Sequence, residues 1–243
     1  MPSCGGRVSC AARRGMIDLY YWPTPNGHKV SVALEEMALP YAVKPIDILS
    51  GEQHTAAFAA ISPNTRVPAI VDHDGPGGAP HTVFESGAIL MYLAEKSGRF
   101  WPTDAAARST VIQWLFFQCA NIGPMFGQCG HFRGYAPERI DYGINRYCGE
   151  TVKLYALMNR VLGERAYLAG ADYSLADMAT YPWCAPIVRQ LHAIEIDEFP
   201  HVKRWIAEIE GRPAVQRGMA LLGDAMKIGN PDEAARAALF GKP

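Results

Sequence analysis

The feature that most constrains this chain is a strand that turns directly into a helix near its start. Residues 17–22 are aliphatic and aromatic apart from one aspartate, and Pro23 follows them, a pattern typical of a buried strand. The apolar residues after the turn recur at the spacing of one helix face: Val30, Ala33, Leu34 and Met37. The turn itself, residues 24–27, therefore lies where the free N–H groups and the positive end of the helix are exposed.

Such a turn can hold an anion, and a thiolate is one candidate. Thr24 and Asn26 lie within the turn and can add hydrogen bonds from their side chains. The alternative is an ordinary helix N-terminus at which Asn26 is the cap. The turn alone does not distinguish an anion-binding site from an ordinary helix N-terminus.

Length and composition favour a folded protein with one large domain or two modest ones. Of its 243 residues, 49% are hydrophobic and 19% are charged, which is enough apolar surface for a substantial core. The net charge of −1 gives no electrostatic reason to expect nucleic acid or an anionic membrane as a partner. No run of 18 apolar residues is present, so we expect no transmembrane helix.

The cysteines and the N-terminal residues indicate the cellular compartment of the protein. The six cysteines have neither the spacing of a zinc site nor a Cys-x-x-Cys pair, so we expect no metal and reduced, mostly buried thiols of a cytoplasmic protein: Cys4, Cys10, Cys119, Cys129, Cys148 and Cys184. Residues 1–15 are rich in glycine, serine, alanine and arginine and lack the apolar core of a secretory signal. We expect a disordered extension there.

Two hydrophobic patterns divide the rest of the chain. Residues 16–98 show the order strand, helix, strand, helix, strand, strand, helix, which begins with a parallel βαβ unit. Pro45 cannot donate a backbone hydrogen bond, so its strand should lie at a sheet edge or end at a bulge. Residues 104–222 contain no convincing strand and predict an all-helical domain, and residues 223–243 form a tail. The predicted fold class is an α/β domain followed by an all-α domain.

The expected elements follow from the same periodicities and from capping signals. In the first domain we expect strands at 17–22, 41–47, 68–72 and 82–84. After the first helix we expect two further helices, at 55–61 and 86–96. Beyond it we expect helices at 105–123, interrupted by Gly123-Pro124, and at 137–163, 174–191, 200–210, 213–222 and 231–239. Ser174 and Asp177 form a capping box, which accounts for Asp177 without any acid–base role.

Two further candidate sites lie in the first domain. The bond between Val67 and Pro68 enters a short strand, and a cis peptide there would turn the Val67 N–H and C=O outward to pair with an extended peptide. An ordinary trans proline is the alternative. Gln53 lies in a loop before the second helix and is a weaker candidate, since most loop glutamines are merely solvated.

A strand ends and a helix begins at residues 84–87, Phe-Glu-Ser-Gly. Ser86 and the N–H groups that follow it suit a carboxylate, and Glu85 beside them suits an ammonium. The two charges together fit the head group of an α-amino acid. A helix cap beside a solvated glutamate is the alternative interpretation.

Taken together, these motifs resemble those of the cytosolic glutathione transferases. The matching segments include Thr-Pro-Asn-Gly at 24–27, Val-Pro-Ala-Ile-Val-Asp at 67–72, Phe-Glu-Ser-Gly at 84–87 and Ser-Leu-Ala-Asp at 174–177. More narrowly, the chain resembles the Nu class, the bacterial disulfide-bond oxidoreductases related to the yeast prion-forming nitrogen regulator. The resemblance extends from Ile17 to about Leu222. It implies a thioredoxin-like first domain of β-α-β-α-β-β-α order that binds glutathione, followed by a helical domain.

The resemblance also implies roles for individual residues. Thr24 and Asn26 would be the catalytic residues that face the sulfur of glutathione, and Val67 would pair with its cysteinyl backbone across a cis Pro68. The other implied glutathione-binding residues are Gln53 along the tripeptide, Glu85 and Ser86 at its γ-glutamyl end, and Arg146, from the neighbouring subunit of a homodimer. The region that lines the family's second-substrate pocket contains Met125, Phe126, Cys129, His131 and Phe132. We expect Cys129 to be a passive thiol.

The residues of the first turn limit which group can act as the nucleophile. Thioredoxins and glutaredoxins carry a reactive cysteine there, whereas residues 24–27 contain neither a cysteine nor a tyrosine or serine that could activate a thiol. The nucleophile would then be the thiolate of bound glutathione, stabilised by Thr24, Asn26 and the helix end. We therefore predict an enzyme, a glutathione-dependent disulfide reductase with glutathione as its co-substrate. The alternatives are conjugation of glutathione to electrophiles, peroxidase activity, and a non-catalytic transferase-like binding module.

Overall fold

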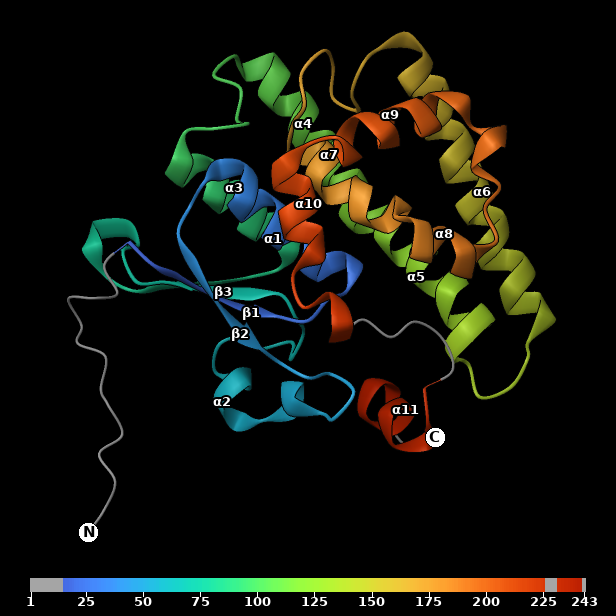
Figure 1. Ribbon diagram of the computed structural model, residues 1–243, viewed down its shortest axis with the longest axis horizontal. Coiled ribbons are helices and arrows are strands. Elements are labelled where there is room, and N and C mark those ends of the chain that lie inside the picture. The colour runs from blue at the N-terminus through green and yellow to red at the C-terminus, as the bar shows by residue number, and fades with distance from the viewer. Residues whose placement is uncertain (1–14, 226–230, 242–243) are drawn as a thin grey trace.

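The computed structural model describes residues 15–225 and 231–241, so the extension expected at residues 1–15 lies, apart from Gly15, outside the described residues. The chain begins with a sheet and its helices and continues as a bundle of helices (Figure 1). The predicted fold class, a thioredoxin-like α/β domain followed by an all-helical one, is confirmed. None of the helices in the described ranges is long and apolar enough to cross a membrane.

A four-stranded sheet with the order β2-β1-β3-β4 forms the centre of the first domain. Its strands are β1 (Ile17–Tyr21), β2 (Tyr41–Pro45), β3 (Ala69–Asp72) and β4 (His81–Phe84). β1 pairs in parallel with β2, as the βαβ pattern predicts, and antiparallel with β3, which pairs antiparallel with β4. β2 lies at one edge, which confirms the prediction made from Pro45.

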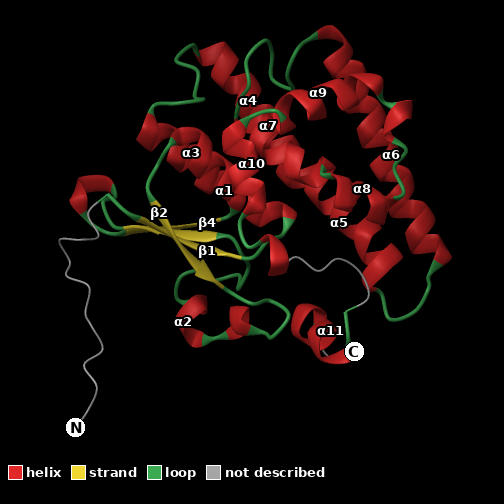
Figure 2. Cartoon of the chain, in the orientation of Figure 1, coloured by secondary structure: helices red, strands yellow, loops and turns green. Residues whose placement is uncertain are grey.

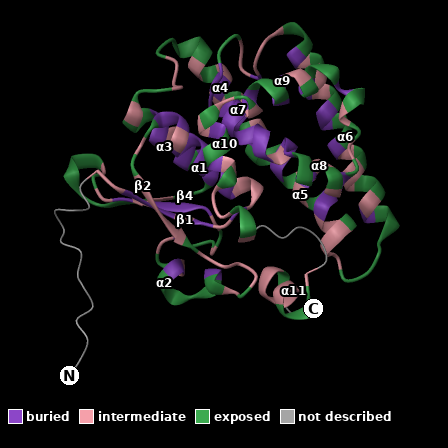
Figure 3. Ribbon diagram, viewed as in Figure 1, coloured by how far each residue is buried: buried purple, intermediate pink, exposed green. Residues whose placement is uncertain are grey.

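Helices cover both faces of this sheet. α1 (Pro25–Met37) and α3 (Ser86–Ser97) lie on one side, and the short α2 (Ala56–Ala59) lies on the other (Figures 1 and 2). The predicted apolar face of α1 is fully in the core: Val30, Ala33, Leu34 and Met37. The helical domain covers the opposite face of α1, so polar residues of this helix are buried too: His28, Lys29, Ser31 and Glu36 (Figure 3). Such buried polar groups need partners from other elements.

The second domain contains α4 (Ala105–Phe117), α5 (Gly123–Gly130), α6 (Asp141–Glu164), α7 (Leu175–Thr180), α8 (Pro186–His192), α9 (Pro200–Glu210) and α10 (Pro213–Ala220). The expected interruption at Gly123-Pro124 is wrong, because a π-helical turn (Gln118–Ile122) connects α4 to α5 without a break. Pro124 follows this π-helical turn directly, where the regular i→i−4 ladder is already altered, so its missing N–H does not end the helix.

Two other helix boundaries differ from the prediction. α6 begins at Asp141, several residues after Pro137. The helix expected over 174–191 is divided by a 3₁₀ turn (Tyr181–Cys184), because the prolines at 182 and 186 cannot continue an α-helical ladder. The capping box before α7 is confirmed: Asp177 accepts hydrogen bonds from the Ser174 N–H and hydroxyl at 2.9 and 3.0 Å.

The two domains are held together mainly by α1 against α10. Gly218 permits the close approach, since a Cβ atom there would lie 2.7 Å from the Cα of Val32. The Ser31 hydroxyl donates to the Gly218 carbonyl at 2.8 Å. Arg212 forms a two-pronged ion pair with Glu36, with N···O distances of 2.6 and 2.8 Å. A buried carboxylate of α1 therefore finds its counter-charge in the second domain.

The tail returns to the first domain. α11 (Glu233–Phe240) begins after Asp232, whose side chain accepts from the Ala235 N–H at 2.8 Å. It starts two residues later than the helix expected at 231–239. The Arg236 side chain donates to the Tyr135 carbonyl at 3.2 Å, and the loop before α2 contacts the end of the helix. α11 therefore bridges the two domains (Figure 1).

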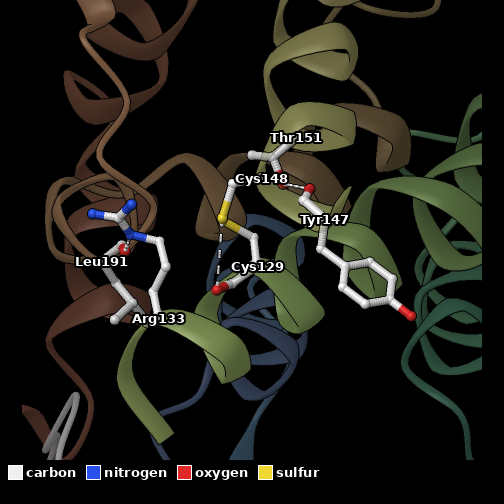
Figure 4. The surroundings of a disulfide bond; sticks show 6 residues. All are labelled: Cys129, Arg133, Tyr147, Cys148, Thr151 and Leu191. Atoms are coloured by element: carbon white, nitrogen blue, oxygen red, sulfur yellow. Dashed lines mark hydrogen bonds between the residues drawn. A yellow bond between two sulfur atoms is a disulfide. The ribbon is translucent and has the colours of Figure 1, made fainter. Parts of the chain in front are cut away.

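A disulfide joins Cys129 of α5 to Cys148 of α6, with Cα atoms 4.7 Å apart (Figure 4). The expectation of reduced thiols is wrong for this pair, because the close packing of α5 on α6 places the two residues opposite each other. Cys119 and Cys184 are free thiols, the first exposed and the second buried. Cys4 and Cys10 lie outside the described residues.

Candidate active site

The turn after β1 is capped by threonine. Thr24 Oγ1 accepts a hydrogen bond from the Gly27 N–H at 3.1 Å, so Thr24, and not Asn26, is the N-cap of α1. The hydroxyl proton of Thr24 is not used in this bond and can be donated elsewhere. Gly27 is needed because a Cβ atom there would overlap the Trp22 carbonyl oxygen. The turn therefore offers one hydroxyl donor beside the positive end of a helix.

A polar cavity of about 210 Å³ lies beside this turn. Three chain segments contribute to it: the first turn of α1, the loop before β3, and the junction between β4 and α3. It brings together five of the predicted glutathione-binding residues: Asn26, Val67, Pro68, Glu85 and Ser86. It also includes residues that the sequence did not single out: Ser62, Asn64, Arg66 and Phe84.

The peptide bond between Val67 and Pro68 is cis, as considered from the sequence. The backbone N–H and C=O of Val67 make no hydrogen bond within the described residues. Upstream, Ser62 supports the loop by donating its hydroxyl to the Arg66 carbonyl at 2.9 Å. An extended peptide in the cavity could therefore pair with Val67 as one more strand.

The junction between β4 and α3 has an unusual backbone. Glu85 has φ of 69° and ψ of 115°, a left-handed region that a residue with a Cβ rarely adopts. Its side chain is exposed at the cavity, whereas Ser86 is 9% exposed and begins α3. The free N–H groups of the helix start and the Ser86 hydroxyl suit a carboxylate, and Glu85 suits an ammonium.

A second cavity of about 220 Å³ opens on the other side of the turn and is mainly apolar. Thr24 lines it, together with residues from the loop after β2 and from α5, α8 and α11. Its larger apolar side chains are Trp22, Ile48, Leu49, Phe126, Trp183, Leu191, Leu239 and Phe240. His192 also lines it, and burial lowers the pKa of this imidazole to about 4, so that it is neutral at pH 7.

Trp183 connects the two cavities. Its indole Nε1 donates to the Asn26 side-chain oxygen at 3.3 Å, while its ring lines the apolar cavity. The bond leaves the amide N–H₂ of Asn26 free to donate into the polar cavity. A ligand whose polar end fills one cavity would therefore place a central atom near Thr24 and Asn26, at the border of the other. Among the described residues, no group of three or more potential metal ligands occurs.

The comparisons with known proteins identify the family. A model of the N-terminal domain of glutathione S-transferase matches residues 24–96, and a model of the C-terminal domain matches residues 148–213. The disulfide-bond oxidoreductase YfcG of Escherichia coli is 46% identical over 212 residues, which cover 86% of this chain and 98% of that protein. This chain belongs to the glutathione S-transferase family.

Solved structures of other members superpose closely on this transferase. A family member from Pseudomonas fluorescens, described with two glutathione molecules bound, is 44% identical with a TM-score of 0.81 and covers 84% of this chain and 92% of its own. A transferase from Pseudomonas putida, described with one glutathione disulfide bound per subunit, is 41% identical with a TM-score of 0.82 and covers 86% and 93% of the two chains. The predicted resemblance is confirmed.

Gln53 of this transferase is not among the residues that line the polar cavity. Its side chain is buried, and its amide nitrogen donates to the Ala238 carbonyl at 3.0 Å and to the Ile48 carbonyl at 3.3 Å. His54 also contacts the Ala238 carbonyl, at 3.1 Å. In this structure Gln53 therefore connects the first domain to α11. A role for Gln53 toward glutathione stays a prediction.

Of the remaining predicted residues, Phe126 lines one of the two cavities and the others line neither. Arg146 of α6 is paired with Glu150 at 2.8 Å and lines neither cavity. Of the five residues expected around the second substrate, Phe126 lines the apolar cavity, whereas Met125, Cys129, His131 and Phe132 do not. Phe132 stacks on Tyr147, and His131 makes an edge contact with Phe240, with centroids 5.3 and 4.7 Å apart.

The residues that the sequence analysis missed come from two sources. Ser62, Asn64 and Arg66 flank the Val67-Pro68 motif, so their proximity to it was the available signal. Trp183 and the end of α11 lie far along the chain from the turn, and nothing in their local pattern distinguishes them from core residues. Only the packing of the second domain on the first reveals them.

Proposed function

We propose that this transferase is a glutathione-dependent disulfide reductase that uses the thiolate of bound glutathione as its nucleophile. The observation that carries the proposal is the turn between the two cavities, which offers hydrogen-bond donors and a helix end but no sulfur. The polar cavity suits the peptide part of glutathione, and the apolar cavity suits the rest of a disulfide substrate. The descriptions of the related E. coli and Pseudomonas proteins support this assignment.

In the proposed complex, the γ-glutamyl carboxylate of glutathione accepts from Ser86, and its ammonium faces Glu85. The cysteinyl backbone pairs with Val67, and the sulfur lies near Thr24 and Asn26. The Thr24 hydroxyl, the free Asn26 amide and the start of α1 then favour the thiolate over the thiol. A hydrogen bond to a charged group is worth roughly 1.5–3 kcal/mol, so a thiol pKa lowered by about one to two units is expected.

The reaction proceeds by two thiol–disulfide exchanges. The glutathione thiolate attacks one sulfur of the substrate disulfide, whose S–S bond breaks, and the departing thiolate takes up a proton. The thiolate of a second glutathione then attacks the glutathione sulfur of the mixed disulfide and releases the second substrate thiol. Two glutathione molecules are oxidised to one glutathione disulfide, and the substrate disulfide gains two electrons and two protons.

The test is the reduction of a small disulfide by glutathione in a variant without cysteines. Replacement of all six by serine should leave most of the activity intact, because no protein sulfur takes part. Asn26→Ala should lower turnover, since it removes a donor at the thiolate. The assay is run below the unfolding temperature of each variant, because the Cys129–Cys148 bond contributes to stability. Loss of activity on replacing Cys129 alone in a folded protein would contradict the mechanism.

Conjugation of glutathione to electrophiles is a second candidate. It is favoured by the apolar cavity beside Thr24, which could accept the ring of an aromatic substrate between Trp22, Phe126 and Trp183. A panel of aryl halides, epoxides, peroxides and disulfides separates the two activities. Turnover of disulfides at a higher kcat/KM than all other classes supports the reductase assignment.

We further propose that the enzyme is a cytoplasmic homodimer in which Arg146 approaches the glutathione of the neighbouring subunit. Arg146 is exposed on α6, and in the described part of the chain its ion-pair partner is Glu150, so it can change partner on assembly. Analytical ultracentrifugation tests the dimer. Arg146→Ala should raise the KM for glutathione in that assembly, with Arg139→Ala as control, because Arg139 forms a similar exposed ion pair with Asp141.

A further inference from the structure

Lys29 is a charged side chain buried beneath the polar cavity. It lies on α1, one turn after Asn26, and only 1% of its surface is exposed. Its ammonium donates to Ser86 Oγ at 3.3 Å and to the Gln118 side-chain oxygen at 2.6 Å. Gln118 belongs to the π-helical turn of the second domain, so the ammonium lies where the two domains meet.

In the part of the chain that the structure describes, both hydrogen-bond acceptors of this ammonium are neutral oxygens. Within the described ranges, no carboxylate forms an ion pair with Lys29, whereas Lys96 is paired with Asp72 at 2.8 Å. A buried lysine without a carboxylate partner is rare, because an unpaired charge is costly in an apolar interior. Burial lowers the pKa of Lys29 to about 8, and Glu85 and Cys119 act in the opposite direction, so the side chain is still charged at neutral pH.

The hydrogen bond to Ser86 determines how its hydroxyl is used. An ammonium can only donate, so Ser86 Oγ must be the acceptor in this contact. The hydroxyl proton of Ser86 is then directed away from Lys29 and is available to the cavity that Ser86 lines. A carboxylate that accepts this proton would be separated from a buried positive charge by one oxygen atom.

We propose that Lys29 is a positioning residue for glutathione: its buried charge holds Ser86 as a donor and, through it, stabilises the γ-glutamyl carboxylate. This inference rests on the proposed function. In a merely structural role, Lys29 would connect Gln118 to Ser86 across the domain boundary. The affinity for the ligand would then not depend on the charge of Lys29. The two roles make opposite predictions when a negative charge is added inside the protein.

Gln118→Glu is the deciding variant. It replaces the neutral acceptor of Lys29 with a carboxylate of the same shape, which pairs with the ammonium in place. A structural role predicts an equal or higher unfolding temperature with unchanged affinity for glutathione. Our proposal predicts that the dissociation constant for reduced glutathione, measured by calorimetry, rises roughly 10-fold to 100-fold in the folded protein, the range of one hydrogen bond to a charged group.

Lys29→Met gives a second measure of the same effect, because methionine fills the volume without the charge. We expect the KM for glutathione to rise in the same range while kcat changes less than about threefold. In the Ser86→Ala background the effect of Lys29→Met should shrink to less than about threefold, since the two residues act together. Lys96→Met is the control, because it removes a lysine paired with Asp72 of β3, outside the residues that line the polar cavity.

A glutathione analogue tests whether the γ-glutamyl carboxylate is the group that Lys29 stabilises. For a glutathione analogue with an amide in place of the γ-glutamyl α-carboxylate, wild type and Gln118→Glu should bind with affinities within about threefold of each other. If wild type binds glutathione and Gln118→Glu binds it equally well, the inference is overturned and the proposed function stands. If wild type binds neither reduced nor oxidised glutathione, the proposed function is overturned, and this inference with it.

Discussion

Thr24 has two separable roles in this structure, and a small set of variants can measure each. Its Oγ1 accepts from the Gly27 N–H at 3.1 Å and caps α1, while its own proton is free to bond the sulfur of glutathione. Thr24→Ser keeps both functions. Thr24→Asp keeps the cap but has no proton to donate, and Thr24→Ala loses both.

The expected magnitudes differ between the two roles. Loss of the cap in Thr24→Ala should cost about 1 kcal/mol of unfolding free energy, whereas Thr24→Asp should stay near wild type because a carboxylate is favourable at a helix start. Loss of the bond to the thiolate should cost roughly 1.5–3 kcal/mol and raise the pKa of bound glutathione by about one to two units. Thr24→Asp should raise this pKa further, because its charge repels the thiolate.

Two measurements separate the capping role of Thr24 from its hydrogen bond to the thiolate. Chemical denaturation gives the free energy of unfolding, and the ultraviolet absorbance of the thiolate against pH gives the pKa of glutathione in the complex. The stability order should be serine and aspartate above alanine, and the order of thiol pKa should be serine, alanine, aspartate from low to high. If Thr24→Ala destabilises the protein but leaves the thiol pKa unchanged, Thr24 is only a helix cap and the reasoning is refuted.

Three further predictions test other parts of the structure. Cys148→Ser opens a link between residues 19 apart in sequence and should lower the unfolding free energy by roughly 3 kcal/mol, with disulfide reductase activity retained below the new melting temperature. Phe240→Ala should raise the KM for an apolar second substrate by up to roughly tenfold without changing the KM for glutathione, and equal shifts in both would count against the position of α11. Affinity for S-methylglutathione should fall as pH rises through about 8, where Lys29 loses its proton, and the fall should be shallower in Lys29→Met, where the ligand's own ammonium still titrates but residue 29 does not.

Local patterns in the sequence were enough for the fold class and for most of the first domain. The buried β1, the apolar face of α1, the edge position of β2 and the capping box of Ser174 all follow from short-range rules and are confirmed. The errors lie where local rules compete. Pro124 is typical of a helix end, but it directly follows a π-helical turn, whose altered hydrogen-bond ladder tolerates a proline within the helix.

The polar cavity could largely be predicted because its residues come from sequence motifs at strand ends. Asn26, Val67, Pro68, Glu85 and Ser86 each lie at a junction that a short motif specifies, and the end of β1, the start of β3 and the end of β4 meet at one end of the sheet. Which residue caps α1 could not be decided from the motif, since Thr24 and Asn26 are both good caps.

Tertiary structure alone decided the rest. The Cys129–Cys148 bond, the Trp183 contact with Asn26 and the α11 wall of the apolar cavity all depend on helices whose separation along the chain carries no information about contact. Lys29 is the clearest case: its place on a helix follows from the sequence, but its burial arises because the second domain covers α1. Sequence periodicity reports which face of a helix is apolar, whereas the partners of its polar side chains are determined only when distant segments pack together.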